Sequence, residues 1–537
     1  MTEQKTIFIL GAGVMQIPAF QAAKSMGWKI IAADGNPAAP GRELADIFEP
    51  IDLKDKERLA DAVKRHQKQG RVDGVFTAGT DFSASVAWVA RECGLPGIPY
   101  EVAVNASEKQ KMREQFRRHH IPQPAFISVT NPDTVDISPM AFPLVVKPVD
   151  NMGARGVRRV DSVEQLHAAV SDALCFSRTH TAIIEEYIDG PEFSLDALVY
   201  DGTITLCGIA DRHIVFEPWF IEMGHTIPSN INRQTLDAIE NVFFSAVKAL
   251  GITTGAAKGD IRLSKNGPLV GEIAARLSGG YMSGWTYPYC SGIPVTRAAL
   301  RIAVGLPPGD LSVREKAVSA ERAFISIPGI VRSIHGTEDA RKSDGIEAFF
   351  LRAEPGSRVV FPQNNVEKCG NVISRKPTRK AAIDAAAAAL HKLCIRLQPD
   401  CEQTDAFLLA ENLPCINAFT LACRENIEYL ETMPAVFGDL RKLSFDEILV
   451  INLPIIQEEQ CGDWHGEPIQ HALKRLGQYV PVRYVDDDMR FEHALGALFW
   501  KAFLRAGVQG GLYVIDSLMD AGSWGRYLTQ MTGRAGR

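Results

Sequence analysis

Residues 260–280 read DIRLSKNGPLVGEIAARLSGG, and this stretch decides how the chain is interpreted. Two alternating runs, Lys258–Leu263 and Pro268–Ala274, flank an Asn-Gly turn signal and so predict a β-hairpin. In such a hairpin Asp260 and Glu272 lie side by side on one face. Two neighbouring carboxylates repel each other unless a cation lies between them, and hard oxygen ligands suit Mg²⁺. The pattern predicts a metal site, with a solvated hairpin as the alternative.

The hairpin is followed by a cation and a flexible turn. Arg276 comes four residues after Glu272, and one residue separates it from the Ser-Gly-Gly at 278–280. A guanidinium at this place can bind a phosphate or a developing oxyanion. The alternative is a surface ion pair without a chemical role.

Composition excludes several classes of protein. The 537 residues are too many for one core, and two to four domains are expected. With 46% hydrophobic residues and a net charge of −6, nothing predicts a general nucleic-acid or membrane binder. No apolar run approaches the ~18 residues of a membrane span. The ten cysteines are scattered and the chain starts directly in a strand pattern, so we expect a reducing cytoplasmic location.

The first hundred residues alternate between strand and helix patterns. Strands are expected at Thr6–Leu10, Lys29–Ala33 and Gly74–Thr77, with helices between them, which predicts a doubly wound parallel sheet. Gly11 and Gly13 resemble the start of a dinucleotide fingerprint, but its third glycine is missing. A tight strand-to-helix turn is therefore favoured over a nicotinamide site.

A second module follows the basic helix Glu108–His119, which we expect to present a solvated face, and the linker Pro122–Pro124. The strand Pro143–Pro148 carries Lys147 in an apolar run, and a buried lysine is costly without an anion. The glycine loop after it could close backbone N–H groups over phosphates. The next strand, Ala182–Tyr187, ends in acids that could bind an adenine or a ribose, or that simply flank a hairpin.

Two further stretches carry weaker signals. Glu222 and His225 lie three apart in a segment rich in aromatics and prolines, which we interpret as irregular and more readily structural than catalytic. Candidates for a substrate pocket are the aromatic side chains after the hairpin and just before Glu222, namely Tyr281, Trp285, Tyr287 and Phe216–Phe220.

The ordered set of lysine strand, glycine loop, acidic hinge and carboxylate hairpin resembles the ATP-grasp superfamily of carboxylate–amine ligases. It is most similar to the L-amino-acid ligase, or dipeptide synthetase, group, and more distantly to carbamoyl-phosphate synthase large-chain modules. The resemblance covers roughly residues 1–400. It implies an α/β and α+β multidomain chain: a Rossmann-like pre-ATP-grasp domain at 1–106, a two-lobed ATP-grasp core at 107–306, and a small C-terminal closing domain at 307–400.

The resemblance also implies roles for residues of this chain. ATP would be bound by the loop from Gly153 to Gly156 and by Lys109, Lys147, Arg155, Glu185, Glu186, Tyr187, Ile188 and Glu192. Mg²⁺, with Mn²⁺ as an alternative, would be held by Asp260 and Glu272. Arg276, Glu222 and His225 would serve the substrates and the acyl-phosphate. The usual asparagine ligand of a second metal is replaced by Ala274, and the first ligand is the shorter Asp260.

The implied activity is an ADP-forming ligase that joins a carboxylate, such as an amino acid, to an amine through an acyl-phosphate. The alternatives are a carbamoyl-phosphate-synthase-like or carboxylase-type enzyme and a non-catalytic ATP-binding subunit. Small-molecule substrates are expected as partners, with a homodimer left open. An accessory α/β module of unknown role is expected at 405–537, with strands at Glu447–Asn452 and Gly511–Ile515 and helices near Ile469–Leu476 and Glu492–Arg505. Within it, residues 464–467 form an expected aromatic turn.

Overall fold

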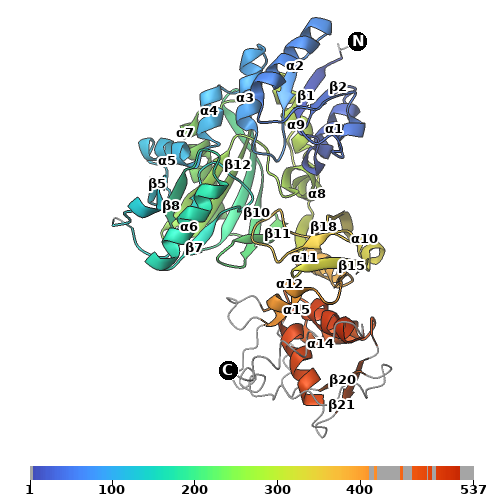
Figure 1. The fold of residues 1–537 in the computed structure, drawn as a ribbon. Coiled ribbons are helices and arrows are strands. Elements are labelled where there is room, and N and C mark those ends of the chain that lie inside the picture. Colours follow the sequence, from blue (N-terminus) through green and yellow to red (C-terminus); the bar gives the residue numbers. More distant parts are fainter. Residues whose placement is uncertain are drawn as a thin grey trace. The chain divides into compact units, whose positions relative to one another are not determined.

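A parallel sheet opens the chain, because its short strands are apolar on both faces and alternate with helices. The computed structural model describes residues 4–138, 140–409, 417–419, 448–451, 462–480, 482–485 and 492–519. The sheet order is β3-β2-β1-β4, as a doubly wound arrangement requires. Figure 1 labels its neighbouring strands β1 and β2. Its elements are β1 Thr6–Leu10, α1 Ile17–Ser25, β2 Lys29–Ala33, β3 Ile47–Glu49, α2 Lys56–Gln69, β4 Gly74–Phe76, α3 Ser83–Glu92 and α4 Tyr100–Asn105.

A four-stranded antiparallel sheet of order β5-β8-β6-β7 forms the next lobe. Its strand β6 alternates buried and partly buried residues, and the apolar face of helix α6 covers the sheet with Leu166, Val170 and Leu174. The elements of this lobe are α5 Lys109–Arg118, β5 Phe126–Val129, β6 Leu144–Pro148, β7 Arg158–Val160, α6 Val163–Phe176 and β8 Ala182–Glu186.

The longest strands of the chain form a second antiparallel sheet, in which β13, β12, β9, β10 and β11 are neighbours in that order. Helix α7 packs against β12 and β13, where Ile239, Phe243 and Val247 share a core with these strands, and this core positions the hairpin predicted from the sequence. The elements are β9 Glu192–Tyr200, β10 Thr203–Val215, β11 Ile221–Ile227, α7 Arg233–Leu250, β12 Gly255–Ser264, β13 Gly267–Ala274, α8 Tyr287–Ser291 and α9 Val295–Ala303.

The chain divides into two compact units. The first comprises Met1–Glu321 with residues 363–365 and 375–383, and the second comprises the remainder. The domain limits expected from the sequence at residues 106, 306 and 400 stay predictions. The elements from residue 318 onward are β14 Val318–Phe324, β15 Gly329–His335, α10 Thr337–Arg341, β16 Ile346–Leu351, β17 Arg358–Val359, β18 Gly370–Lys376, α11 Arg379–Leu390, β19 Cys394–Leu397, α12 Glu402–Leu409, β20 Ile448–Ile451, α14 Ile469–Leu476, β21 Val482–Val485 and α15 Glu492–Met519.

Two predictions of secondary structure are wrong. Glu222 and His225 lie in the regular strand β11, not in an irregular segment, because the strand pairs with β10 along its length. Gly511–Ile515 lies inside the long helix α15, where its apolar residues are buried on all sides; an apolar run of this length does not distinguish a strand from a buried helix. The predicted strand at 447–452 is confirmed over Ile448–Ile451, while its two ends fall outside the described residues. The predicted helices at Ile469–Leu476 and Glu492–Arg505 are confirmed.

The turn at residues 464–467 is packed, as expected. The Trp464 ring meets Phe361 edge to face at 5.2 Å between centroids, and Glu467 is paired with Arg475 at 2.5 Å. Among the described residues, no helix has the length and apolar character needed to cross a membrane.

Candidate functional site

The predicted hairpin is present, and its register sets the geometry of the site. Strands β12 and β13 pair with Asp260 opposite Glu272 and Lys258 opposite Ala274. Because side chains two residues apart share one face of a strand, Lys258 and Asp260 project to the same side. The hairpin therefore brings a lysine, as well as the two acids, to this face of the sheet.

A cleft of about 160 Å³ lies between this hairpin and the four-stranded lobe. It gathers eight of the side chains that the sequence assigned to a nucleotide or a metal: Lys147, Glu185, Glu186, Tyr187, Ile188, Glu192, Asp260 and Glu272. The same cleft is lined by Val145, Val157, Phe220, Arg262 and Gly271, which the sequence did not assign to it. The aromatic and aliphatic walls with charged groups at their edges match the chemistry of a nucleotide.

One wall of the cleft is aromatic. The rings of Tyr187 and Phe220 stack at 6.1 Å between centroids, and the guanidinium of Arg262 lies 5.5 Å from the Tyr187 ring. Arg262 also donates a hydrogen bond of 2.9 Å to the carbonyl of Ile188. Phe220 thus belongs to this wall, whereas the sequence suggested it for a substrate pocket.

Lys147 is held by a buried ion-pair network. Its Nζ lies 2.7 Å from Glu185, and Glu185 also accepts a two-pronged pair from Arg113 at 2.8 and 3.1 Å. Burial lowers the pKa of Lys147. Burial would raise the pKa of Glu185, but Arg113 and Lys147 outweigh it and hold that pKa at about 2. The network keeps a cation at the cleft wall, where it can meet an anionic phosphate.

Lys109 and the glycine loop lie beside the cleft without lining it. Lys109 donates 2.8 Å to the carbonyl of Asn151 at the start of the loop, and its Nζ is 3.9 Å from Glu272. Gly153 and Gly156 have φ of 71° and 68°, a conformation that glycine adopts at little cost. Arg155 donates 2.9 Å to the carbonyl of Met152 within the loop, and burial lowers its pKa.

Asn365 ties this loop to the strand that carries Glu222. Its backbone N–H donates 2.9 Å to the carbonyl of Gly153, and its side-chain oxygen accepts a bond of 2.8 Å from the N–H of Glu222. A movement of the loop would therefore shift Asn365 and, through its hydrogen bond to Glu222, strand β11.

Arg212 joins three of the acids. Its guanidinium is paired with Glu192, with Glu222 at 2.8 Å and with Asp260 at 3.0 Å. Glu192 is also held by Arg262 at 2.8 Å. These acids are therefore neutralised by side chains of the protein itself.

Asp260 is engaged at both oxygens. One accepts a bond of 3.0 Å from the Ser194 hydroxyl, and the other is paired with Lys258 and Arg212. Burial would raise the pKa of Asp260, but these two cations outweigh it and lower the pKa to about 2. Glu272 differs, because its side chain is 32% exposed and Lys109 is its paired cation.

A divalent ion fits this arrangement at one of the two carboxylates. Glu272 can offer an oxygen to an ion that also binds nucleotide phosphates, which is the usual way in which Mg²⁺ is held. Among the described residues, no group of three or more His, Cys, Asp or Glu side chains is placed to hold a metal. The assignment of Asp260 and Glu272 as joint metal ligands stays a prediction.

His225 and Glu222 lie on one strand, and both contact further polar groups. His225 Nδ1 is 3.2 Å from Glu321 and 4.0 Å from Glu222, and its Nε2 is 2.8 Å from the Thr286 hydroxyl. The imidazole is completely buried, whereas the Glu222 side chain keeps some exposure. Of the two side chains, only that of Glu222 is therefore in contact with solvent.

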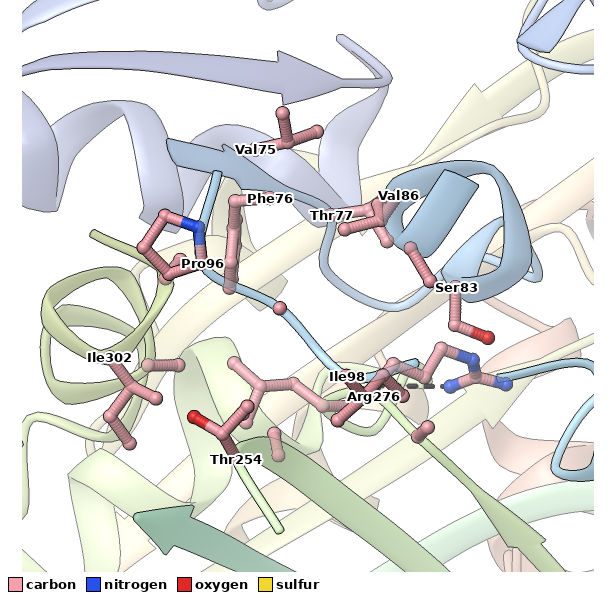
Figure 2. A pocket seen from close by; sticks show the side chains of 18 residues that line it. Val75, Phe76, Thr77, Ser83, Val86, Pro96, Ile98, Thr254, Arg276 and Ile302 are labelled. Carbon is pink, nitrogen blue, oxygen red and sulfur yellow. Dashed lines mark hydrogen bonds between the residues drawn. The ribbon is translucent and has the colours of Figure 1, made fainter. Parts of the chain in front are cut away.

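Arg276 lies outside the cleft that Lys147 and the hairpin line, at a second cavity of about 80 Å³ (Figure 2). The labelled side chains around it are mostly apolar, with Val75, Phe76, Pro96 and Ile302 among them. Arg276 is only 8% exposed; its Nη1 donates 3.0 Å to the Leu277 carbonyl, and its buried Nε has no hydrogen-bond partner. A buried guanidinium with a free donor can bind an anion.

Sequence reasoning missed four polar residues of the site: Arg113, Arg212, Lys258 and Arg262. Helix α5 buries Lys109, Met112, Arg113 and Phe116, so its two cations share the spacing of the apolar face. That spacing was the available signal, and the expectation of a simply solvated basic face is wrong for these two residues. Nothing local marks Arg212, whose partners lie 10, 20 and 48 residues away.

Three family models match successive parts of the chain. The ATP-grasp N-terminal domain matches residues 20–97, the ATP-grasp domain matches 140–284, and L-amino acid ligase C-terminal domain 2 matches 323–398. The chain is 26% identical over 335 residues to carnosine synthase 1 of Gallus gallus, a match that covers 57% of this chain and 36% of that protein. The chain thus spans about a third of the length of that relative.

Three further proteins are matched over more of their own length. An uncharacterised protein of Sinorhizobium fredii is 24% identical over 66% of this chain and 74% of its own length. The L-amino acid ligase of Bacillus licheniformis superposes with a TM-score of 0.66 at 23% identity, over 74% of this chain and all of that one. The phosphoribosylglycinamide synthetase of Anaerococcus prevotii superposes with a TM-score of 0.60 at 22% identity, over the same share of each. These two likenesses show the fold.

The matched models follow the order of the motifs: lysine strand, glycine loop, acidic hinge and carboxylate hairpin all lie within or beside residues 140–284. The chain therefore contains an ATP-grasp domain at 140–284, preceded by an ATP-grasp N-terminal domain and followed by a C-terminal domain of the L-amino acid ligase type.

Proposed function

We propose that the chain is an ATP-dependent, ADP-forming ligase that joins a small carboxylate, such as an amino acid, to an amine through an acyl-phosphate. The observation that carries the proposal is the cleft in which Lys147 and an aromatic wall face the carboxylate hairpin. The ligase relatives support the reaction class. The identity of both substrates belongs to the proposal.

In this proposal the nucleotide base lies against Tyr187 and Phe220, and its phosphates extend toward Lys147 and Lys109. The ribose meets the acidic edge at Glu192, whose arginine partners fix its orientation. A divalent ion bound with ATP neutralises phosphate charge, and Glu272 is the carboxylate that would hold it. We propose Mg²⁺ for this ion, because it favours a carboxylate together with phosphate oxygens.

The remaining residues act on the substrates. Arg276 would neutralise the carboxylate before phosphorylation and the oxyanion after amine attack, since a fixed guanidinium stabilises developing negative charge. Glu222 would accept a hydrogen bond from the incoming amine, and His225 would hold Glu222 and Thr286 in place as a positioning residue. The loop from Gly153 to Gly156 would exclude water, which an acyl-phosphate requires.

The test measures products from the full chain. Purified protein is incubated with ATP, Mg²⁺, a panel of amino acids and a panel of amines, and the nucleotide and condensation products are quantified. ADP and an amide that form only with both substrates would support the proposal. ADP without an amide favours a carboxylase-type or carbamoyl-phosphate-synthase-like reaction, and ATP binding without turnover favours a non-catalytic subunit.

A further inference from the structure

Lys258 lies where it can act as a metal ion would. It is 8% exposed, stands opposite Ala274 across the hairpin, and is paired through Nζ with the carboxylate of Asp260. The ammonium of Lys258 therefore already compensates one of the two acids of the hairpin.

The surroundings of Asp260 leave little room for a dication. One carboxylate oxygen accepts the Ser194 hydroxyl, and the other is shared by Lys258 and Arg212. A divalent ion at Asp260 would have to approach two fixed cations in a buried setting, where charge repulsion is screened poorly. The acid would also have to release partners that already compensate its burial.

The residue opposite Lys258 contributes nothing to a metal site. Ala274 offers a methyl group, whereas a second divalent ion at this end of the hairpin would need an oxygen ligand. A lysine ammonium is a compact point charge and is the side chain that most resembles a small cation. Lys258 thus supplies a positive charge at this end of the hairpin, and Ala274 lacks the side-chain oxygen that a second divalent ion would need.

We propose that Lys258 is a built-in cation that takes the place of a second divalent ion, so that the site binds one metal ion per nucleotide, on Glu272. This inference rests on the proposed function for its nucleotide. It concerns ion binding alone, so it can fail while the ligase activity stands.

The experiment counts Mn²⁺ ions on the full chain. Mn²⁺ is titrated in the presence of a saturating non-hydrolysable ATP analogue, and electron paramagnetic resonance separates free from bound ion. We expect one bound Mn²⁺ per chain for the wild type. Two bound ions with comparable affinities would overturn the inference without touching the ligase proposal, whereas absence of analogue binding would remove both.

Variants then test the residue itself. In Lys258→Met/Ala274→Asn the fixed cation is gone and an oxygen ligand is present. We therefore expect this variant to bind a second Mn²⁺, with an affinity at least tenfold higher than that of any second ion on the wild type. An unchanged count in that variant, with analogue binding intact, would contradict the role of Lys258. Lys265→Met, in the exposed hairpin turn, is the matched control and should bind ions as the wild type does.

Discussion

Arg113 is predicted to be the largest single polar contributor to the stability of the first unit. Its guanidinium is completely buried and donates four hydrogen bonds, two to Glu185 at 2.8 and 3.1 Å and two to the carbonyls of Val270 and Gly271 at 2.7 and 2.8 Å. The side chain thus joins helix α5 to strand β8 and to the hairpin strand β13.

The substitution Arg113→Met removes the charge and keeps an apolar stem. Removal of one partner of a buried ion pair costs about 3–5 kcal/mol, because the other charge stays buried without full compensation. Lys147 remains 2.7 Å from Glu185 and limits that penalty, while two carbonyls lose their donors, at a further cost of about 1–3 kcal/mol each when taken alone. Since these contributions are not additive, we expect a loss of about 3–5 kcal/mol in the free energy of unfolding.

The assay is urea unfolding of the full chain, followed by hydrogen exchange of peptides that span β8, Ala182–Glu186, so that the first unit is read separately. Arg118→Met, on the exposed side of the same helix, is the control and should stay within about 0.5 kcal/mol of the wild type. Addition of Glu185→Gln to Arg113→Met should recover part of the loss, because it removes the uncompensated carboxylate. A loss below about 1 kcal/mol in the single variant would refute the reasoning.

Four further outcomes are expected. Lys147→Ala should abolish ATP binding in calorimetry, because it removes the cation at the cleft wall; unchanged affinity would exclude the cleft as the nucleotide site. Glu272→Gln should keep the fold, checked by circular dichroism, and lose Mg²⁺-dependent turnover, since an amide is a poor ligand for a hard dication. Arg276→Ala should keep ATP affinity and slow single-turnover ADP formation by about 10²–10³, the scale for loss of one oxyanion donor, with little recovery in Arg276→Lys; equal losses of affinity and rate would instead make it a nucleotide ligand. Burial raises the pKa of Asp196 from 3.8 to about 6, so between these pH values the folded chain holds a proton on Asp196 that the unfolded chain releases. The free energy of unfolding therefore falls as the pH rises from about 4 to about 6. Asp196→Asn should remove that loss, worth up to about 3 kcal/mol, from unfolding curves measured across this range.

The hairpin was predictable because its signals are local. An Asn-Gly turn signal between two alternating runs indicates both strands. The pairing of Asp260 with Glu272 also depends on a register shift between Asp260 and Ile261, which the turn does not specify. The lysine strand and the acidic hinge were predictable for a similar reason, since each is a short run with one unusual residue type. Each of these parts of the site lies in one short stretch of sequence, so its signal can be recognised without knowledge of distant residues.

The ion pairs were not predictable, because their partners are distant in the sequence. Arg113 lies 72 residues from Glu185 and Arg212 lies 48 from Asp260, and no local pattern indicates either contact. The role of Lys258 depends on the residue across the hairpin and on Arg212 together. Periodicity also failed for Gly511–Ile515, where an apolar run is buried in a helix.

The central claim is that ATP activates a carboxylate as an acyl-phosphate. The most direct measurement uses the amino-acid panel with ¹⁸O in the carboxylates, together with ATP, the metal and the amine panel, and determines the isotope in the phosphate by mass spectrometry. If the carboxylate oxygen is transferred to the γ-phosphoryl group, one ¹⁸O appears in the inorganic phosphate, and ADP is the nucleotide product. Formation of AMP and pyrophosphate with ¹⁸O in the AMP, or of unlabelled phosphate alongside the amide, would contradict the account.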